Sequence, residues 1–171
     1  MAKQVAIYQS KSLGAGYSLL QDAFSASDVE LIESIPGGGG LTLILKGDEN
    51  TLKDLAVKAG ADSRYGFHLI QSHGESILKS FYSLSTTGLA KHLGILETEN
   101  SVEIFRIAEM AVSEGLQVTE LRLSRGSGIG RGHLILSGDN KEALENIGSK
   151  IKADARWTTI MDRSAKFDDL F

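Results

Sequence analysis

The stretch VELIESIPGGGGLTLILKGDENTLKDL, residues 29–55, has a counterpart later in the same chain, VTELRLSRGSGIGRGHLILSGDNKEAL, residues 118–144. In both, an apolar segment leads into a glycine-rich loop, and a second apolar segment ends at a Gly-Asp pair. The two pairs, Gly47-Asp48 and Gly138-Asp139, are 91 residues apart. The chain therefore contains one structural unit written twice.

The match extends towards the N-terminus of each unit. QVAIYQS at 4–10 corresponds to HLGILET at 92–98, and Ile7 and Ile95 are 88 residues apart. Between these points, Glu30-Leu31 is matched with Glu120-Leu121 at a spacing of 90. The spacing between matched residues thus grows from 88 to 91 along the unit. We expect the extra residues of the second unit to lie in turns. Two fused units can replace two identical subunits in a symmetric ring, where each loop recurs around one axis.

Each unit has the order β-α-β-β-α-β, which predicts a mixed α/β (α+β) fold. Leu13, Tyr17, Leu20 and Phe24 recur at helical spacing, and Ser101, Phe105, Ala108 and Val112 match them in the second unit. The Asp of each Gly-Asp pair is expected to cap the following helix. The pattern predicts strands near 4–9, 29–35, 41–46 and 65–71, and near 118–124, 133–137 and 156–161; it predicts helices at 50–60, 74–84 and 140–152, and a short one in the C-terminal RSAKFDDLF.

Composition narrows the function classes. The 171 residues divide into a first unit, 1–85, and a second unit, 86–171. Units of about 85 residues usually need partners to pack against. The chain has no cysteine, which fits a reducing compartment and excludes disulfides and thiolate metal sites. A net charge of −4 does not favour binding to the negatively charged backbone of a nucleic acid. No apolar run suits a membrane span and no signal peptide is evident, so we expect a cytoplasmic protein.

The two glycine loops, Pro36–Gly40 and Arg125–Gly132, are the main candidates for a site. Glycine permits positive φ and close backbone approach to a ligand or a symmetry mate. Neither loop is followed by Gly-Lys-Ser/Thr, and a strand rather than a helix follows each, so nucleotide binding is disfavoured. A plain hairpin turn is the simpler alternative. It is weakened because the loops are longer than two residues and occur in both units.

Other polar residues do not form a catalytic pattern. His68, His73, His92 and His133 show no metal-ligand spacing and are interpreted as structural. Glu97, Glu99 and Glu103 could form a carboxylate pair, but the solvated start of a helix is the favoured interpretation. Phe67 and Trp157 are expected in core or interface packing. Ser127 lacks a G-x-S-x-G context. An α/β enzyme with a site at the glycine loops remains a third hypothesis, disfavoured by the missing base and nucleophile. We therefore expect no enzyme, cofactor or metal.

Several segments, taken in order, resemble the shell-protein (BMC) domain of bacterial microcompartments. The opening-strand signature of that family looks like residues 93–98, LGILET, and its Val-Glu-Leu strand looks like residues 29–31. Its Gly-Ser-Gly pore loop resembles 126–128, its Lys-Gly-Asp strand end resembles 46–48, and its closing segment resembles 68–73. The order and spacing, repeated twice, carry the resemblance.

The resemblance implies a tandem-domain subunit that forms a homotrimer imitating a six-domain ring, set in a microcompartment shell with partner shell proteins. The pore for small metabolites would be lined by Pro36, Gly37, Gly38, Gly39, Gly40, Arg125, Gly126, Ser127, Gly128, Ile129 and Gly130. Lateral contacts would involve Ser25, Ser113 and Arg163. Because serine replaces the family's edge lysine at the first two positions, we expect mainly isolated trimers. The alternative is a free-standing trimer that acts as a scaffold or binds a small ligand.

Overall fold

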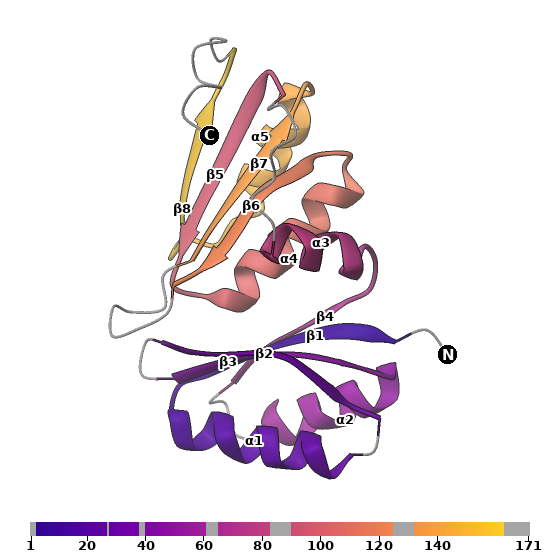
Figure 1. The fold of residues 1–171 in the computed structure, drawn as a ribbon. Helices are drawn as coiled ribbons and strands as arrows, with labels where there is room; N and C mark the ends of the chain where they lie inside the picture. The colour runs from indigo at the N-terminus through magenta and orange to yellow at the C-terminus, as the bar shows by residue number, and fades with distance from the viewer. Residues whose placement is uncertain are drawn as a thin grey trace.

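The computed structural model describes residues 3–26, 28–37, 40–60, 65–82, 90–124 and 132–162. It confirms the β-α-β-β-α-β order in both units (Figure 1). The first unit contains β1 (Gln4–Ser10), α1 (Leu13–Ser25), β2 (Glu30–Gly37), β3 (Gly40–Gly47), α2 (Glu49–Gly60), β4 (Tyr65–Ile70) and α3 (Gly74–Tyr82). The second contains β5 (His92–Thr98), α4 (Ser101–Ser113), β6 (Gln117–Leu123), β7 (Gly132–Gly138), α5 (Lys141–Ser149) and β8 (Arg156–Ile160). The proposed boundary between 85 and 86 lies outside the described residues and stays a prediction.

Each unit builds one antiparallel four-stranded sheet. The strand orders are β2-β3-β1-β4 and β6-β7-β5-β8, which are the same order in the two units. Ile7 lies between Ile44 and His68, and Ile95 lies between Ile135 and Thr158. The spacing of 88 between the opening strands is therefore confirmed.

The second strands correspond differently from the sequence match. Both carry a β-bulge, between Leu31 and Glu33 in β2 and between Val118 and Glu120 in β6. Glu33 faces Ile44 and Glu120 faces the equivalent Ile135. Glu120 therefore corresponds to Glu33, and the spacing of 90 was wrong. The reason is that a Glu-Leu pair occurs in both strands at different registers, which a comparison of letters cannot separate.

The glycine loops differ in length between the units. Gly37 pairs with Gly40, so two residues join β2 to β3, whereas Leu123 pairs with Gly132 across a longer connection. The expectation of two long loops was wrong for the first one, because Pro36, Gly37 and Gly40 belong to strands. Gly40 has a packing reason to lack a side chain: a Cβ there would lie 1.8 Å from the Ser10 carbonyl oxygen.

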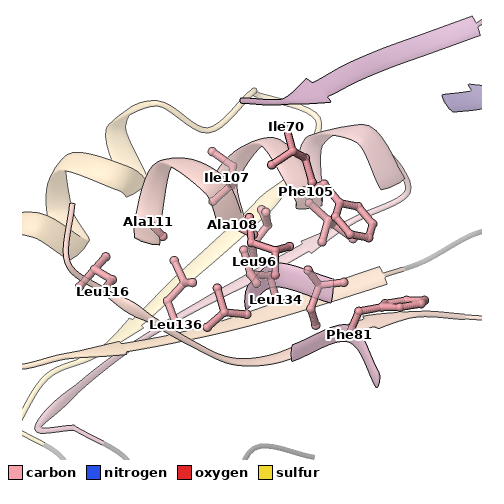
Figure 2. Packing of buried hydrophobic residues seen from close by; sticks show 14 of the residues in the cluster. Ile70, Phe81, Leu96, Phe105, Ile107, Ala108, Ala111, Leu116, Leu134 and Leu136 are labelled. Atoms are coloured by element: carbon pink, nitrogen blue, oxygen red, sulfur yellow. The ribbon is translucent and has the colours of Figure 1, made fainter. Parts of the chain in front are cut away.

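Helices cover both faces of the first sheet. α1 and α2 pack on one face, on a cluster that includes Tyr8, Leu43 and Leu45. α3 and α4 lie on the opposite face, and α4 also packs against β6 and β7 of its own unit (Figure 1). One apolar cluster therefore runs through both units. Figure 2 shows Ile70 of β4 on one side of α4 and Leu134 and Leu136 of β7 on the other.

Side-chain caps set the helix starts. Ser12 accepts a hydrogen bond from the Ala15 N–H at the start of α1, and Asn100 accepts one from Glu103 N–H at the start of α4. Asp48 accepts from the Asn50 and Thr51 N–H groups, so its predicted capping role is confirmed. Its counterpart Asp139 instead accepts from the Lys91 N–H, and the cap of α5 is Asn140.

Tyr8 offers a simple test of the first core. Its hydroxyl donates to the Leu52 carbonyl oxygen at 2.6 Å, and burial raises the pKa of the phenol well above its usual value. Tyr8→Phe keeps the ring and removes this bond. We expect it to lower the free energy of unfolding by about 1 kcal/mol, measured by urea denaturation. No change at all would show that the Tyr8 hydroxyl makes no net contribution.

Candidate functional site at the joint between the units

The two units meet through α4, which is buried on both sides; this contact is called the joint below. Phe105 is fully buried, and its ring centroid lies 5.9 Å from that of Phe81 in α3. In Figure 2 the Phe105 ring projects from α4 between Ile70 and Phe81. The outer face of α4 therefore belongs to the core of the first unit.

The N-terminal end of α4 is held by β1 and β3. The Gln9 amide donates to the Glu99 carbonyl oxygen at 3.0 Å and accepts from the Ser101 N–H at 2.7 Å. The Ser101 and Thr42 hydroxyls are 2.8 Å apart. These bonds fix the position of the helix along the first sheet.

A polar pair holds the middle of α4. Nε2 of His68 in β4 lies 2.8 Å from a carboxylate oxygen of Glu109. The other Glu109 oxygen accepts from the Ser72 N–H at 2.7 Å. Because His68 and Ser72 belong to the first unit and Glu109 to the second, the joint is specified by polar contacts as well as by apolar packing.

Glu103 in the first turn of α4 is buried, with its side chain 1% exposed, so the expected solvated position was wrong. Arg106 donates to both carboxylate oxygens, and Lys152 lies 3.7 Å away. Burial by itself raises the pKa of this carboxyl, but the hydrogen bonds and charge of Arg106, with Lys152, hold it below its usual value. The helical spacing of the apolar residues in the sequence does not by itself indicate that Glu103 points into the protein interior.

The corresponding face of α1 is exposed. Tyr17, the counterpart of Phe105, is 56% exposed, and Leu13 and Phe24 are also exposed. The side that α1 buries on its own sheet is formed by Ala15, Gly16, Leu19 and Ala23. Of the four apolar residues at helical spacing in the sequence, Leu13, Tyr17 and Phe24 are therefore exposed, and only Leu20 packs against the core of its own unit.

A cavity of about 810 Å³ lies where β5 ends and β8 begins, beside the joint. Its lining includes the ionisable residues Lys11, Glu97, His133, Asp154 and Arg156. Arg156 and Glu97 lie 3.9 Å apart, and His133 lies 3.2 Å from Glu120. Sequence reasoning missed this cavity, because its residues come from separate strands. One signal in the sequence could have indicated the cavity. Two charged residues of the second unit, Glu97 and Arg156, correspond to the uncharged Gln9 and Gly66 of the first unit.

The predicted pore residues are only partly described. Pro36 is exposed and Gly37 half-buried in β2, and Gly40 is buried at the start of β3. The others lie outside the described residues: Gly38, Gly39, Arg125, Gly126, Ser127, Gly128, Ile129 and Gly130. The pore assignment therefore stays a prediction.

The predicted lateral residues occupy equivalent places. Ser25 ends α1 and Ser113 ends α4, and each hydroxyl donates at 2.9 Å to the carbonyl oxygen four residues earlier, Gln21 and Glu109 respectively. Arg163 and the predicted C-terminal helix lie outside the described residues.

The remaining candidates have packing or pairing roles. His92 accepts from the Asp162 N–H at 3.0 Å. Phe67 packs on Tyr8 with ring centroids 4.9 Å apart, and Trp157 packs against the second core, as expected. Among the described residues, no group of three or more His, Asp or Glu side chains could hold a metal ion. Nor does any helix in the described ranges have the length and apolar character needed to cross a membrane.

Comparisons with known proteins support the fold. The sequence matches no protein-family model. It matches no curated protein either. A solved microcompartment protein from Desulfitobacterium hafniense superposes with a TM-score of 0.71 at 16% identity, over 99% of each chain. The acetolactate synthase small subunit from Thermotoga maritima gives a TM-score of 0.30 at 14% identity, over 96% of this chain and 99% of the other, a likeness too low to carry an argument. Over nearly its whole length, the chain therefore shares the fold of a microcompartment protein.

Proposed function

We propose that this chain is a structural subunit of a bacterial microcompartment shell, which assembles as a homotrimer imitating a six-unit ring. One observation carries the proposal. The outer face of α4 is buried on the neighbouring unit, whereas the same face of α1, with Tyr17 at its centre, is exposed. A second chain that repeats the joint would cover this face.

Such a contact is heterologous, because α1 of one chain meets the sheet of another chain's second unit. Heterologous contacts close into a ring when the rotation allows. The internal joint is already one such step between related units. Three two-unit chains would complete the six-unit ring that the resemblance implies, and the fold shared with a microcompartment protein supports the role in a shell.

In this ring the glycine loops would surround a central pore for small polar metabolites, and partner shell proteins would surround the trimer in the cytoplasm. The role is structural rather than enzymatic. A free-standing trimer is the second candidate. It is favoured by Ser25 and Ser113, whose short side chains are already bonded within their own helices and offer no lysine-like reach to a neighbouring disc.

The trimer is tested by mass and by one substitution. Light scattering at micromolar concentration should give about three times the 18.4 kDa chain mass. Tyr17→Asp should reduce it to that of a single chain, because an unpaired carboxylate would be buried in the contact. Val57→Asp is the matched control. Val57 is 72% exposed on α2, outside the proposed contact, so this variant should stay trimeric.

Three results would contradict separate parts of the proposal. A wild-type protein of one or two chain masses would contradict the ring. A trimer whose mass survives Tyr17→Asp would keep the ring but contradict the use of α1. For the shell role, electron microscopy of the protein mixed with partner shell proteins should show trimers incorporated into sheets, and their exclusion would favour the free-standing trimer.

A further inference from the structure

We infer that the cavity between Glu97, His133 and Arg156 is the receptor for the N-terminal turn of α1 from a second copy of this chain. This inference rests on the proposed trimer and names its contact residues. The residues that grip α4 in the joint have counterparts around this cavity. In the first sheet Gln9 pairs with Thr42 and Gly66, and in the second sheet Glu97 pairs with His133 and Arg156.

The internal joint and the proposed contact between chains each pair a small residue with a large one, but on opposite sides. In the joint, Gly66 leaves room for Val102 of α4: a Cβ on Gly66 would lie 3.2 Å from a Val102 methyl carbon. The counterpart of Gly66 is the large Arg156, and the counterpart of Val102 is Gly14, around which no atom lies within 4 Å of an added Cβ. A small residue thus faces a large one in both contacts, with the roles reversed.

The charges also fit this occupant. Gln9 donates to the Glu99 carbonyl oxygen and accepts from the Ser101 N–H at the start of α4. Glu97, as a carboxylate, would make only the accepting contact, from the Leu13 N–H at the start of the docked α1. The first turn of α1 contains no acidic residue, whereas that of α4 contains Glu103. A carboxylate from outside would therefore complement the helix dipole. Lys11 of the receiving chain already lines this cavity with Glu97. Lys11 of the docked α1, just before the Ser12 cap, would add a second ammonium group near the same carboxylate.

The rest of the contact follows the joint. Tyr17 would lie where Phe105 lies, facing Ile95, which is half-buried, and Ile135. The His68–Glu109 pair would be replaced by the exposed Thr158 and by Gln21, a neutral pair able to hydrogen-bond. No charge would be left without a partner by this exchange.

A cysteine pair tests the contact directly, since the chain contains no cysteine of its own. The double variant Gly14→Cys/Arg156→Cys should form disulfides between chains. Its internal control is Gly66→Cys/Val102→Cys, where a Cβ on Gly66 lies 3.7 Å from the Val102 Cβ, within the range of disulfides. The control should close within one chain, and each single variant should stay unlinked.

The expected result is a covalent species of three chains on a non-reducing gel, converted to single chains by dithiothreitol. If the reduced double variant is a trimer by light scattering and the control closes, the absence of interchain disulfides overturns this contact while leaving the trimer intact. If the wild type is a single chain, the proposed function itself fails.

A charge exchange covers the case in which the cysteine variant does not assemble. Lys11→Glu should raise the chain concentration needed for trimers, because two carboxylates then meet, and adding Glu97→Lys should restore assembly. A double variant no better than the single one would overturn the pairing of these two residues. Full assembly of Lys11→Glu alone would do the same.

Discussion

Replacing Phe105 with alanine is expected to lower the free energy of unfolding by about 3–5 kcal/mol, because the change leaves a cavity in a core shared by both units. Phe105 is fully buried and packs on Phe81 across the joint. Urea denaturation followed by circular dichroism measures the loss. Val57→Ala on the exposed face of α2 should change the same quantity by less than about 0.5 kcal/mol.

A loss below about 1 kcal/mol for Phe105→Ala would be typical of a surface residue. It would contradict the burial of the outer face of α4, and with it the internal joint from which the contact between chains is inferred.

The second large effect is expected for Arg106→Met, which removes the main partner of the buried Glu103. The free energy of unfolding should fall by about 3 kcal/mol at neutral pH, the low end for breaking a buried pair, because Lys152 remains near the carboxylate. Lys141→Met removes an exposed i,i+4 pair with Glu145 and should cost less than about 0.5 kcal/mol.

The pH dependence of stability is a separate test of the role of the Glu103 charge. The pKa of its carboxyl is lower in the folded protein than the usual 4.5, so the carboxylate binds protons more readily in the unfolded chain. Its stabilising contribution is therefore complete above about pH 4.5 and is lost as the pH falls through the folded pKa. Glu103→Gln should thus be less stable than the wild type at pH 7, with the difference shrinking below pH 4.5. A difference independent of pH would show that the Glu103 charge contributes nothing.

Much of the fold could be predicted from repeated local patterns. Alternating apolar residues around Ile7 and Ile95, and the Gly-Asp pairs that follow β3 and β7, set the strands, their ends and their correspondence. The second strands could not be aligned, because the Glu-Leu pair gives no information on which cross-strand partner each residue takes. The bulges decide that, and they are set by pairing in the sheet.

The joint was harder to predict for a different reason. Tyr17 and Phe105 look alike as apolar residues at helical spacing, yet one is exposed and the other buried. Periodicity predicts that a face is apolar but not what covers it. The same holds for Glu103, which lies three residues from Arg106 in a pattern equally typical of a solvated helix start. Both outcomes depend on packing between elements distant in the chain.

The apolar cluster that runs through both units has a consequence for how the chain folds. α4 gains its full burial only when the sheets of both units are formed, so neither half should be stable alone and unfolding should be one cooperative transition. Most contacts that hold α4 against the first sheet join residues far apart in sequence, such as Gln9 and Ser101, and forming them requires closing long loops. We therefore expect that the two repeated units, although separate in the sequence, unfold together as a single cooperative domain.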